Sequence, residues 1–256
     1  MSINHRDRDN SAPAFYASPG FVRNERAREW WTLAHPPYTL CHLSFVVVGA
    51  CLQGPVNATI LGATLAAFLL AVGVGAHALD EIHGRPLATS IPTWQLVVAA
   101  TIGLAGACAF GVYGMFSVNR SLVYFIILGV VIAVGYNLEL FRGRLHNDLV
   151  FALGWGAFPV LTAYFAQRGT LDPVAFVGAL YALMIAIAQR RLSTPARILR
   201  RSTSRVEGSL TMLDGGTSPL TRDQLLAPLE GTLRSLCWAT VLLAAALAFD
   251  RFHVHF

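Results

Sequence analysis

Seven apolar stretches constrain this chain more than any other feature, because each is long enough, or nearly so, to cross roughly 30 Å of hydrocarbon. They lie near residues 37–54, 57–79, 95–116, 120–141, 147–166, 173–189 and 234–250. Only 13% of the residues are charged, which is about half of what a soluble domain carries. Such a chain cannot cover a water-exposed surface. The pattern therefore predicts an all-α membrane bundle of about seven transmembrane helices.

The placement of arginine predicts the orientation of that bundle. All 19 basic residues are Arg, and with a cytoplasmic N-terminus 16 of the 19 lie inside, leaving only Arg120, Arg168 and Arg251 outside. This is the bias that cytoplasmic loops carry. We therefore expect an integral protein of the cell inner or plasma membrane, with its N-terminus in the cytoplasm and its C-terminus outside. The predicted parts are a cytoplasmic segment at 1–36 and a bundle at 37–256, with a cytoplasmic loop at 190–233.

The net charge of +5 follows from this arginine bias. The chain has no nucleic-acid motif and no basic stripe interleaved with aromatic residues. The predicted partners are membrane lipids and a lipid-like ligand, and no nucleic acid.

One polar segment, "AHALDEIHGRPLATSIP", spans residues 76–92 at the end of the second stretch. His77, Asp80 and Glu81 share one helical face there, at spacings i, i+3 and i+4. Ionisable groups at the end of a spanning helix are costly unless they meet water, a metal or a partner. Carboxylate oxygens suit Mg²⁺, so Asp80 and Glu81 are predicted metal ligands. In the alternative interpretation, both carboxylates simply pair with Arg85 or another nearby Arg.

A second polar segment lies within residues 136–159, between the fourth and fifth stretches. Asn137, Glu139 and Arg142 are predicted to face the same cytoplasmic mouth, where Asn137 or Glu139 orients a substrate. His146 and Asp148 have two possible roles. Together with Asn147 they are predicted to form the N-terminal cap of the next helix, and the alternative for both is a ligand role.

A third segment, "QRRLSTPARILRRSTSR", spans residues 189–205. Its Arg190, Arg191 and Arg197 carry guanidinium groups, which match the geometry of phosphate oxygens. The alternative is ordinary juxtamembrane charge that fixes topology and contacts anionic lipid. Pro195 interrupts the stretch and predicts a bend between Arg191 and Arg197.

The order of these segments resembles the UbiA superfamily of membrane prenyltransferases. "LAHPPYTLCHLSFVVVGACL" resembles that family's opening helix, and "HALDEIHGRPLAT" resembles its first Asp-rich segment. "GYNLELFRGRLHNDLVFALGWGAFPVL" is similar to the connection between its fourth and fifth helices. The resemblance covers roughly residues 30–195 and depends on order and position as much as on identities.

The resemblance implies a reaction and a set of site residues. In that family Mg²⁺ is held against a prenyl diphosphate, whose chain lies in a cavity among the helices. Loss of diphosphate leaves a carbocation, which a lipophilic acceptor attacks. The implied catalytic residues are Asp80, Asn137 and Glu139, and the implied metal ligands are Asp80 and Glu81. The implied substrate-binding residues are His77, Arg85, Arg142, Arg190, Arg191 and Arg197.

The chain also departs from the family's pattern. Of the positions that match the first Asp-rich motif, only Asp80 carries a carboxylate, while His77 and Gly84 occupy two of the others. Residues 173–206, where a second Asp-rich motif is expected, contain no carboxylate. Two hypotheses follow: a diverged prenyltransferase acting on an isoprenoid diphosphate, or a non-catalytic protein of the same fold that binds a lipid or a partner. A transporter is a third hypothesis, although the chain shows no evident internal repeat.

Overall fold

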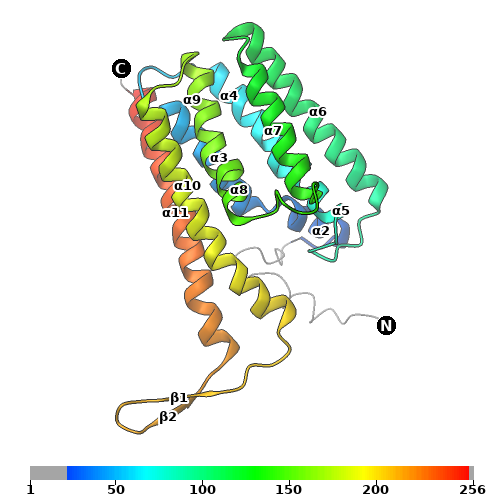
Figure 1. Ribbon diagram of the computed structural model, residues 1–256, viewed down its shortest axis with the longest axis vertical. Helices are drawn as coiled ribbons and strands as arrows, with labels where there is room; N and C mark the ends of the chain where they lie inside the picture. Colours follow the sequence, from blue (N-terminus) through cyan, green and yellow to red (C-terminus); the bar gives the residue numbers. More distant parts are fainter. Residues whose placement is uncertain (1–21, 254–256) are drawn as a thin grey trace.

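The computed structural model describes residues 22–253, and helices make up most of them (Figure 1). The first half contains α2 (Glu25–Ala34), α3 (Pro36–Cys51), α4 (Ala58–Phe68), η2 (Leu69–Ala76), α5 (His77–Ile82), α6 (Thr93–Ser117) and α7 (Leu122–Asn137). The second half contains α8 (Asp148–Ala152), η3 (Leu153–Ala157), α9 (Phe158–Arg168), α10 (Pro173–Arg197), η4 (Ile198–Ser202), β1 (Ser209–Thr211), β2 (Thr217–Pro219) and α11 (Arg222–His253). The segments labelled η are π-helical turns that continue the neighbouring α-helices.

Five helical stretches in the described part are long and apolar enough to cross a membrane. They are Ala58–Ile82, Thr93–Ser117, Asp148–Arg168, Pro173–Ser202 and Arg222–Phe252. This confirms the helical bundle and indicates an integral membrane protein. The other two predicted spans coincide with α3 and α7, which have 16 residues each. A helix of that length rises about 24 Å, so crossing by all seven stretches stays a prediction.

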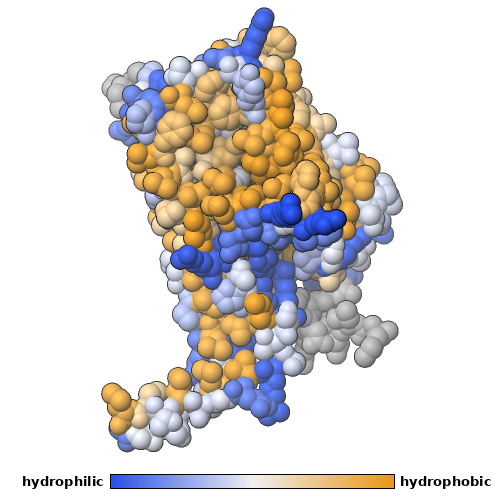
Figure 2. Space-filling model, viewed as in Figure 1, coloured by the Kyte–Doolittle hydropathy of each residue, from blue (hydrophilic) through white to orange (hydrophobic). Residues whose placement is uncertain are grey.

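The outer surface of the bundle is apolar. Ile102, Phe116 and Val177 expose 62%, 78% and 69% of their surface. Figure 2 shows a hydrophobic surface above a hydrophilic band, with the long α10–α11 pair continuing beyond that band. An exposed apolar belt bounded by polar groups is what lipid requires of a spanning bundle.

Side-chain caps fix where several of these helices begin. The side chain of Asn57 accepts from the Ile60 amide at 3.1 Å, and the side chain of Asn147 accepts from the Val150 amide at 2.9 Å. Such caps satisfy backbone donors that the first helical turn leaves unpaired. The predicted cap before α8 is therefore Asn147. His146 instead stacks on Tyr136, with ring centroids 4.4 Å apart.

Glycine lets helices approach closely at two crossings. A Cβ atom on Gly103 of α6 would lie 2.7 Å from the Leu70 carbonyl oxygen in η2. A Cβ atom on Gly156 of η3 would lie 2.6 Å from the Ala182 carbonyl oxygen in α10. Both contacts are backbone to backbone, as expected for packing through small residues in membranes.

The last two long helices lie side by side and extend past the rest of the bundle (Figure 1). Helix α10 continues through Pro195 to Arg197 and then into the π-helical η4, so Pro195 does not end the helix, and the bend expected between Arg191 and Arg197 stays a prediction. Arg200 of η4 is held to the buried Glu230 of α11 by two contacts, one of them 2.7 Å between Nη2 and Oε2.

The connection between these helices is shorter than the sequence predicts. Helix takes up residues 190–202 and 222–233 of the predicted loop, which leaves residues 203–221. Within that connection β1 and β2 form an antiparallel pair, with Leu210 opposite Ser218. Exposed polar residues alone could not distinguish a loop from helix ends that project into water.

Candidate functional site

Five of the predicted site residues line one polar cavity of about 150 Å³. His77 and Asp80 come from α5, Asn137 from the last turn of α7, and Arg190 and Arg197 from α10. The three helices are far apart in the sequence, so the convergence of their ends is a property of the tertiary fold. We call this cavity the polar pocket.

Glu81 does not line the polar pocket. Its side chain is fully buried, and its two carboxylate oxygens accept hydrogen bonds from the Leu87 amide at 3.0 Å and from the Thr89 amide and hydroxyl at 2.9 and 2.8 Å. These bonds fix the loop between α5 and α6. Adjacent residues on a helix point about 100° apart, which is why Asp80 lines the cavity and Glu81 does not.

Arg85 and Glu139 also have other partners. The Arg85 guanidinium donates to the Ile91 carbonyl at 2.6 Å and to the Thr93 hydroxyl at 2.8 Å. Glu139 lies outside the pocket wall, with its carboxylate 3.6 Å from His83 Nε2 and 3.8 Å from His146 Nδ1. Neither residue is brought to the cavity that holds Asp80.

Arg142 and Arg191 are exposed and do not line the polar pocket. Arg142 has a φ of +61° in the turn after α7. Arg191 follows Arg190 by one residue and therefore points to another side of the helix. The pocket-lining positions 190, 193, 197 and 201 recur at three or four residues, which is the repeat of one helical face.

Sequence reasoning counted Arg201 among the possible phosphate donors of the segment at 189–205 but not among the site residues, although the same helical repeat indicates it. Arg201 lines the polar pocket, and its Nη1 donates to the Pro86 carbonyl at 3.0 Å. It is the third guanidinium in the wall. Among the described residues that line the pocket, the Asp and Arg side chains are thus Asp80, Arg190, Arg197 and Arg201.

His35 and Tyr38 were also missed as site residues. His35 separates α2 from α3 with a left-handed φ of +44°, and its ring lies 5.0 Å from that of His77. Burial, followed by the charges of His77, Arg201 and Arg197, lowers the pKa of His35 well below its ordinary value. His35 therefore adds no positive charge to the pocket near neutral pH.

Aromatic rings form a second wall of the polar pocket. Tyr136 stacks on His146, and its ring centroid lies 4.7 Å from that of Trp155. Trp155 in turn stacks on Phe151 at 5.5 Å. The Tyr136 hydroxyl is buried and has no hydrogen-bond partner within the described part of the chain. This leaves a donor in the pocket wall for a ligand.

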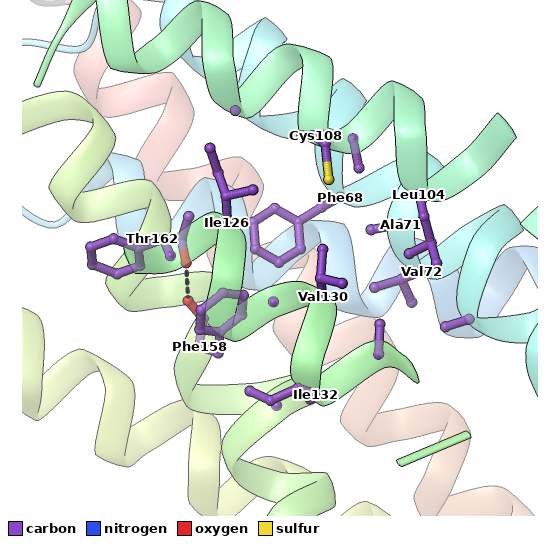
Figure 3. Close-up of a pocket in the computed structure, with 18 of the residues that line it drawn as sticks. Phe68, Ala71, Val72, Leu104, Cys108, Ile126, Val130, Ile132, Phe158 and Thr162 are labelled. Carbon is purple, nitrogen blue, oxygen red and sulfur yellow. Dashed lines mark hydrogen bonds between the residues drawn. The ribbon is translucent and has the colours of Figure 1, made fainter. Parts of the chain in front are cut away.

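An apolar cavity of about 120 Å³, drawn in Figure 3, shares lining residues with the polar pocket and so adjoins it. Its walls come from the α4–η2 stretch, α6, α7 and the η3–α9 stretch. Phe68, Val72, Leu104, Cys108, Ile126, Val130, Ile132 and Phe158 are among the side chains that line it. Ala76 and Trp155 line both cavities. Both residues lie in π-helical segments, which are often found at functional sites.

The side chains do not fit the predicted magnesium site. Asp80 is the only carboxylate among the described residues that line the pocket, because the carboxylate of Glu81 is hydrogen-bonded to the α5–α6 loop. The described residues include no group of three or more His, Cys, Asp or Glu suited to a metal ion. Three guanidinium groups in the same wall would in addition repel a divalent cation.

Comparison with known proteins gives no match: no family model, no curated protein and no solved structure is similar to this chain. The arrangement of the two cavities is therefore the basis for any functional proposal.

Proposed function

We propose that this chain is a UbiA-like membrane protein that binds an isoprenoid diphosphate and transfers its prenyl group to a lipophilic acceptor. In this proposal the diphosphate occupies the polar pocket and the prenyl chain occupies the apolar cavity. The observation that carries the proposal is that Ala76 and Trp155 line both cavities. A ligand with an anionic head and an apolar chain matches such a pair of adjoining sites.

Arginine supports the proposed position of the diphosphate. Arg190, Arg197 and Arg201 come from one face of α10 and η4, and all three line the pocket. Guanidinium groups bind phosphate oxygens through two parallel hydrogen bonds and remain charged at any relevant pH. Arg190 is oriented by Asp148, whose carboxylate lies 2.9 Å from its Nε. The buried Tyr136 hydroxyl could supply a further hydrogen bond.

The apolar cavity supports the proposed position of the chain. Its lining is almost entirely hydrocarbon and aromatic, and Thr162 directs its hydroxyl to the Phe158 carbonyl at 2.7 Å (Figure 3). Transfer would break the bond between the allylic carbon and the diphosphate oxygen, and the electron pair would leave with the diphosphate. An apolar cavity that excludes water would protect the resulting cation until the acceptor attacks.

A second candidate is a non-catalytic protein that binds such a lipid without transferring its chain. Asp80 is the single carboxylate among the described residues of the pocket, which favours this alternative, because the UbiA enzymes that the sequence resembles have Asp-rich motifs. Release of inorganic diphosphate from geranyl diphosphate, with a lipophilic phenol as acceptor, distinguishes the two. A binding protein would retain its ligand intact.

The polar half of the proposal is tested by calorimetric titration of the purified full chain with geranyl diphosphate. Arg197→Ala and Arg197→Lys should each weaken binding by about tenfold, because a lost paired contact to phosphate is worth about 1.4 kcal/mol. Arg191→Ala is the matched control, since Arg191 is on the same helix but exposed outside the pocket. Equal dissociation constants in all four proteins would reject a role for the polar pocket.

The apolar half is tested with Cys108→Phe, which places a larger side chain in the cavity (Figure 3). This variant should bind geranyl diphosphate more weakly than the wild type does. Its affinity for inorganic diphosphate, which has no chain, should not change. If both ligands are affected equally, the chain does not lie in this cavity.

A further inference from the structure

The side chains that line the polar pocket carry more positive than negative charge, whereas a metal-binding site carries mainly negative charge. Among the described residues, three guanidinium groups and one carboxylate line the wall, and one of the three, Arg190, also pairs with Asp148. Asp80 comes from α5, whereas the three guanidinium groups come from α10 and η4, so the cavity lies between them. Within the described residues Asp80 has no ion pair at contact distance. Asp80 therefore faces the cationic wall across the cavity.

A cation would meet an unfavourable field in this cavity. Among the described lining residues, Mg²⁺ would approach three positive groups and one negative group, and the Coulomb repulsion from the guanidinium groups would oppose its binding. Recruiting Glu81 as a second ligand would cost its three hydrogen bonds to the α5–α6 loop. An anion would be attracted by the same guanidinium groups, and it would take over part of the charge compensation that Asp80 gives to Arg197.

We infer that the polar pocket binds its phosphate headgroup without a divalent cation, and that Asp80 is a counter-ion of the cationic wall around Arg197 when no anion is bound. This inference rests on the proposed function and specifies how the headgroup is recognised. Asp80 and a bound phosphate compete for the same guanidinium groups. Removing the negative charge of Asp80 should thus strengthen anion binding, whereas it would weaken binding at a metal site.

The experiment titrates the full chain in detergent with geranyl diphosphate and, separately, with inorganic diphosphate, in EDTA and in excess MgCl₂. The inference predicts that the wild type binds in EDTA at least as tightly as in MgCl₂. Asp80→Asn keeps the shape of the side chain and removes its charge. This variant should bind both ligands about tenfold more tightly in EDTA, because the carboxylate no longer competes with phosphate for the guanidinium groups. Asp250→Asn is the matched control, because Asp250 lies at the far end of α11 beside Arg251.

The outcomes are distinct. Binding that requires MgCl₂ and is weakened by Asp80→Asn overturns the inference and leaves the proposed function intact. Metal-independent binding of inorganic diphosphate that Asp80→Asn strengthens, without tighter binding of the geranyl compound, supports the inference and rejects the lipid function. If no protein binds either ligand under either condition, both proposals are rejected. Thermal unfolding of each variant shows whether it is folded.

Discussion

At the scale of single residues, the neighbouring carboxylates Asp80 and Glu81 show how one helical step separates two roles. Asp80 lines the polar pocket, while Glu81 is buried against the loop that follows α5. The sequence predicts both as ligands because both lie at the end of a spanning helix. The tertiary structure places the Leu87 and Thr89 amides beside Glu81, so its carboxylate accepts their hydrogen bonds and is not available to a ligand.

A residue-scale prediction concerns His35, whose pKa is lowered in the folded protein mainly by burial. In the unfolded chain the pKa of His35 is about 6.5. Above that pH, His35 is neutral in both the folded and the unfolded protein and adds no pH dependence to the free energy of unfolding. As the pH falls below that value, the unfolded chain binds a proton that the folded chain does not, so stability falls. One such group changes the free energy of unfolding by at most about 1.4 kcal/mol per pH unit.

His35→Asn should remove this contribution and keep the left-handed backbone, which Asn tolerates. Thermal unfolding between pH 7 and pH 5 should therefore give a shallower loss of stability in the variant. Between pH 7 and pH 8 the two proteins should respond alike. Parallel curves across the whole range would show that His35 does not resist protonation in the folded state.

At the scale of elements, two π-helical segments bring the cavities together. η2 carries Ala76 and η3 carries Trp155, and each segment has a glycine-mediated contact with a neighbouring helix. Gly103 of α6 allows the contact with η2, and Gly156 allows the contact of η3 with α10. Close helix packing therefore positions the residues shared by the two cavities.

An element-scale prediction compares two glycines within helices. Gly103→Ala should lower the free energy of unfolding by about 1–3 kcal/mol, since its Cβ would overlap the η2 backbone. Gly62→Ala in α4 should be neutral or stabilising, because a Cβ there meets nothing within 4 Å and Ala favours helix. Unfolding in detergent by a graded denaturant measures both. Equal effects at the two positions would contradict the packing argument.

At the scale of the whole molecule, the polar groups gather toward one end of an apolar bundle. The hydrophilic band of Figure 2 lies below the hydrophobic surface, and the α10–α11 pair extends beyond it. The polar pocket is built where α5, α7 and α10 end or leave the apolar region. A headgroup site at this level can meet water while the adjoining cavity remains in hydrocarbon.

The whole-molecule prediction is the topology. Reporter fusions at residues 1 and 256 should place the N-terminus in the cytoplasm and the C-terminus outside, because 16 of the 19 Arg then lie inside. A reporter inserted after Gly215, in the exposed β1–β2 turn, should give the cytoplasmic signal. Finding both termini on the same side would reject the odd number of crossings.

The sequence by itself determined the helical membrane architecture, because hydrocarbon demands long apolar stretches whose backbone groups are paired internally. It also indicated His77, Asp80, Asn137, Arg190 and Arg197, since each lies where an apolar stretch ends. Only the tertiary structure decided which charges share a cavity. Glu81 and Arg85 form hydrogen bonds with the loop between α5 and α6. Arg191 lies on the exposed side of α10, whereas Arg201 lines the polar pocket. Those choices depend on helix rotation and on contacts between distant segments, which local patterns do not specify.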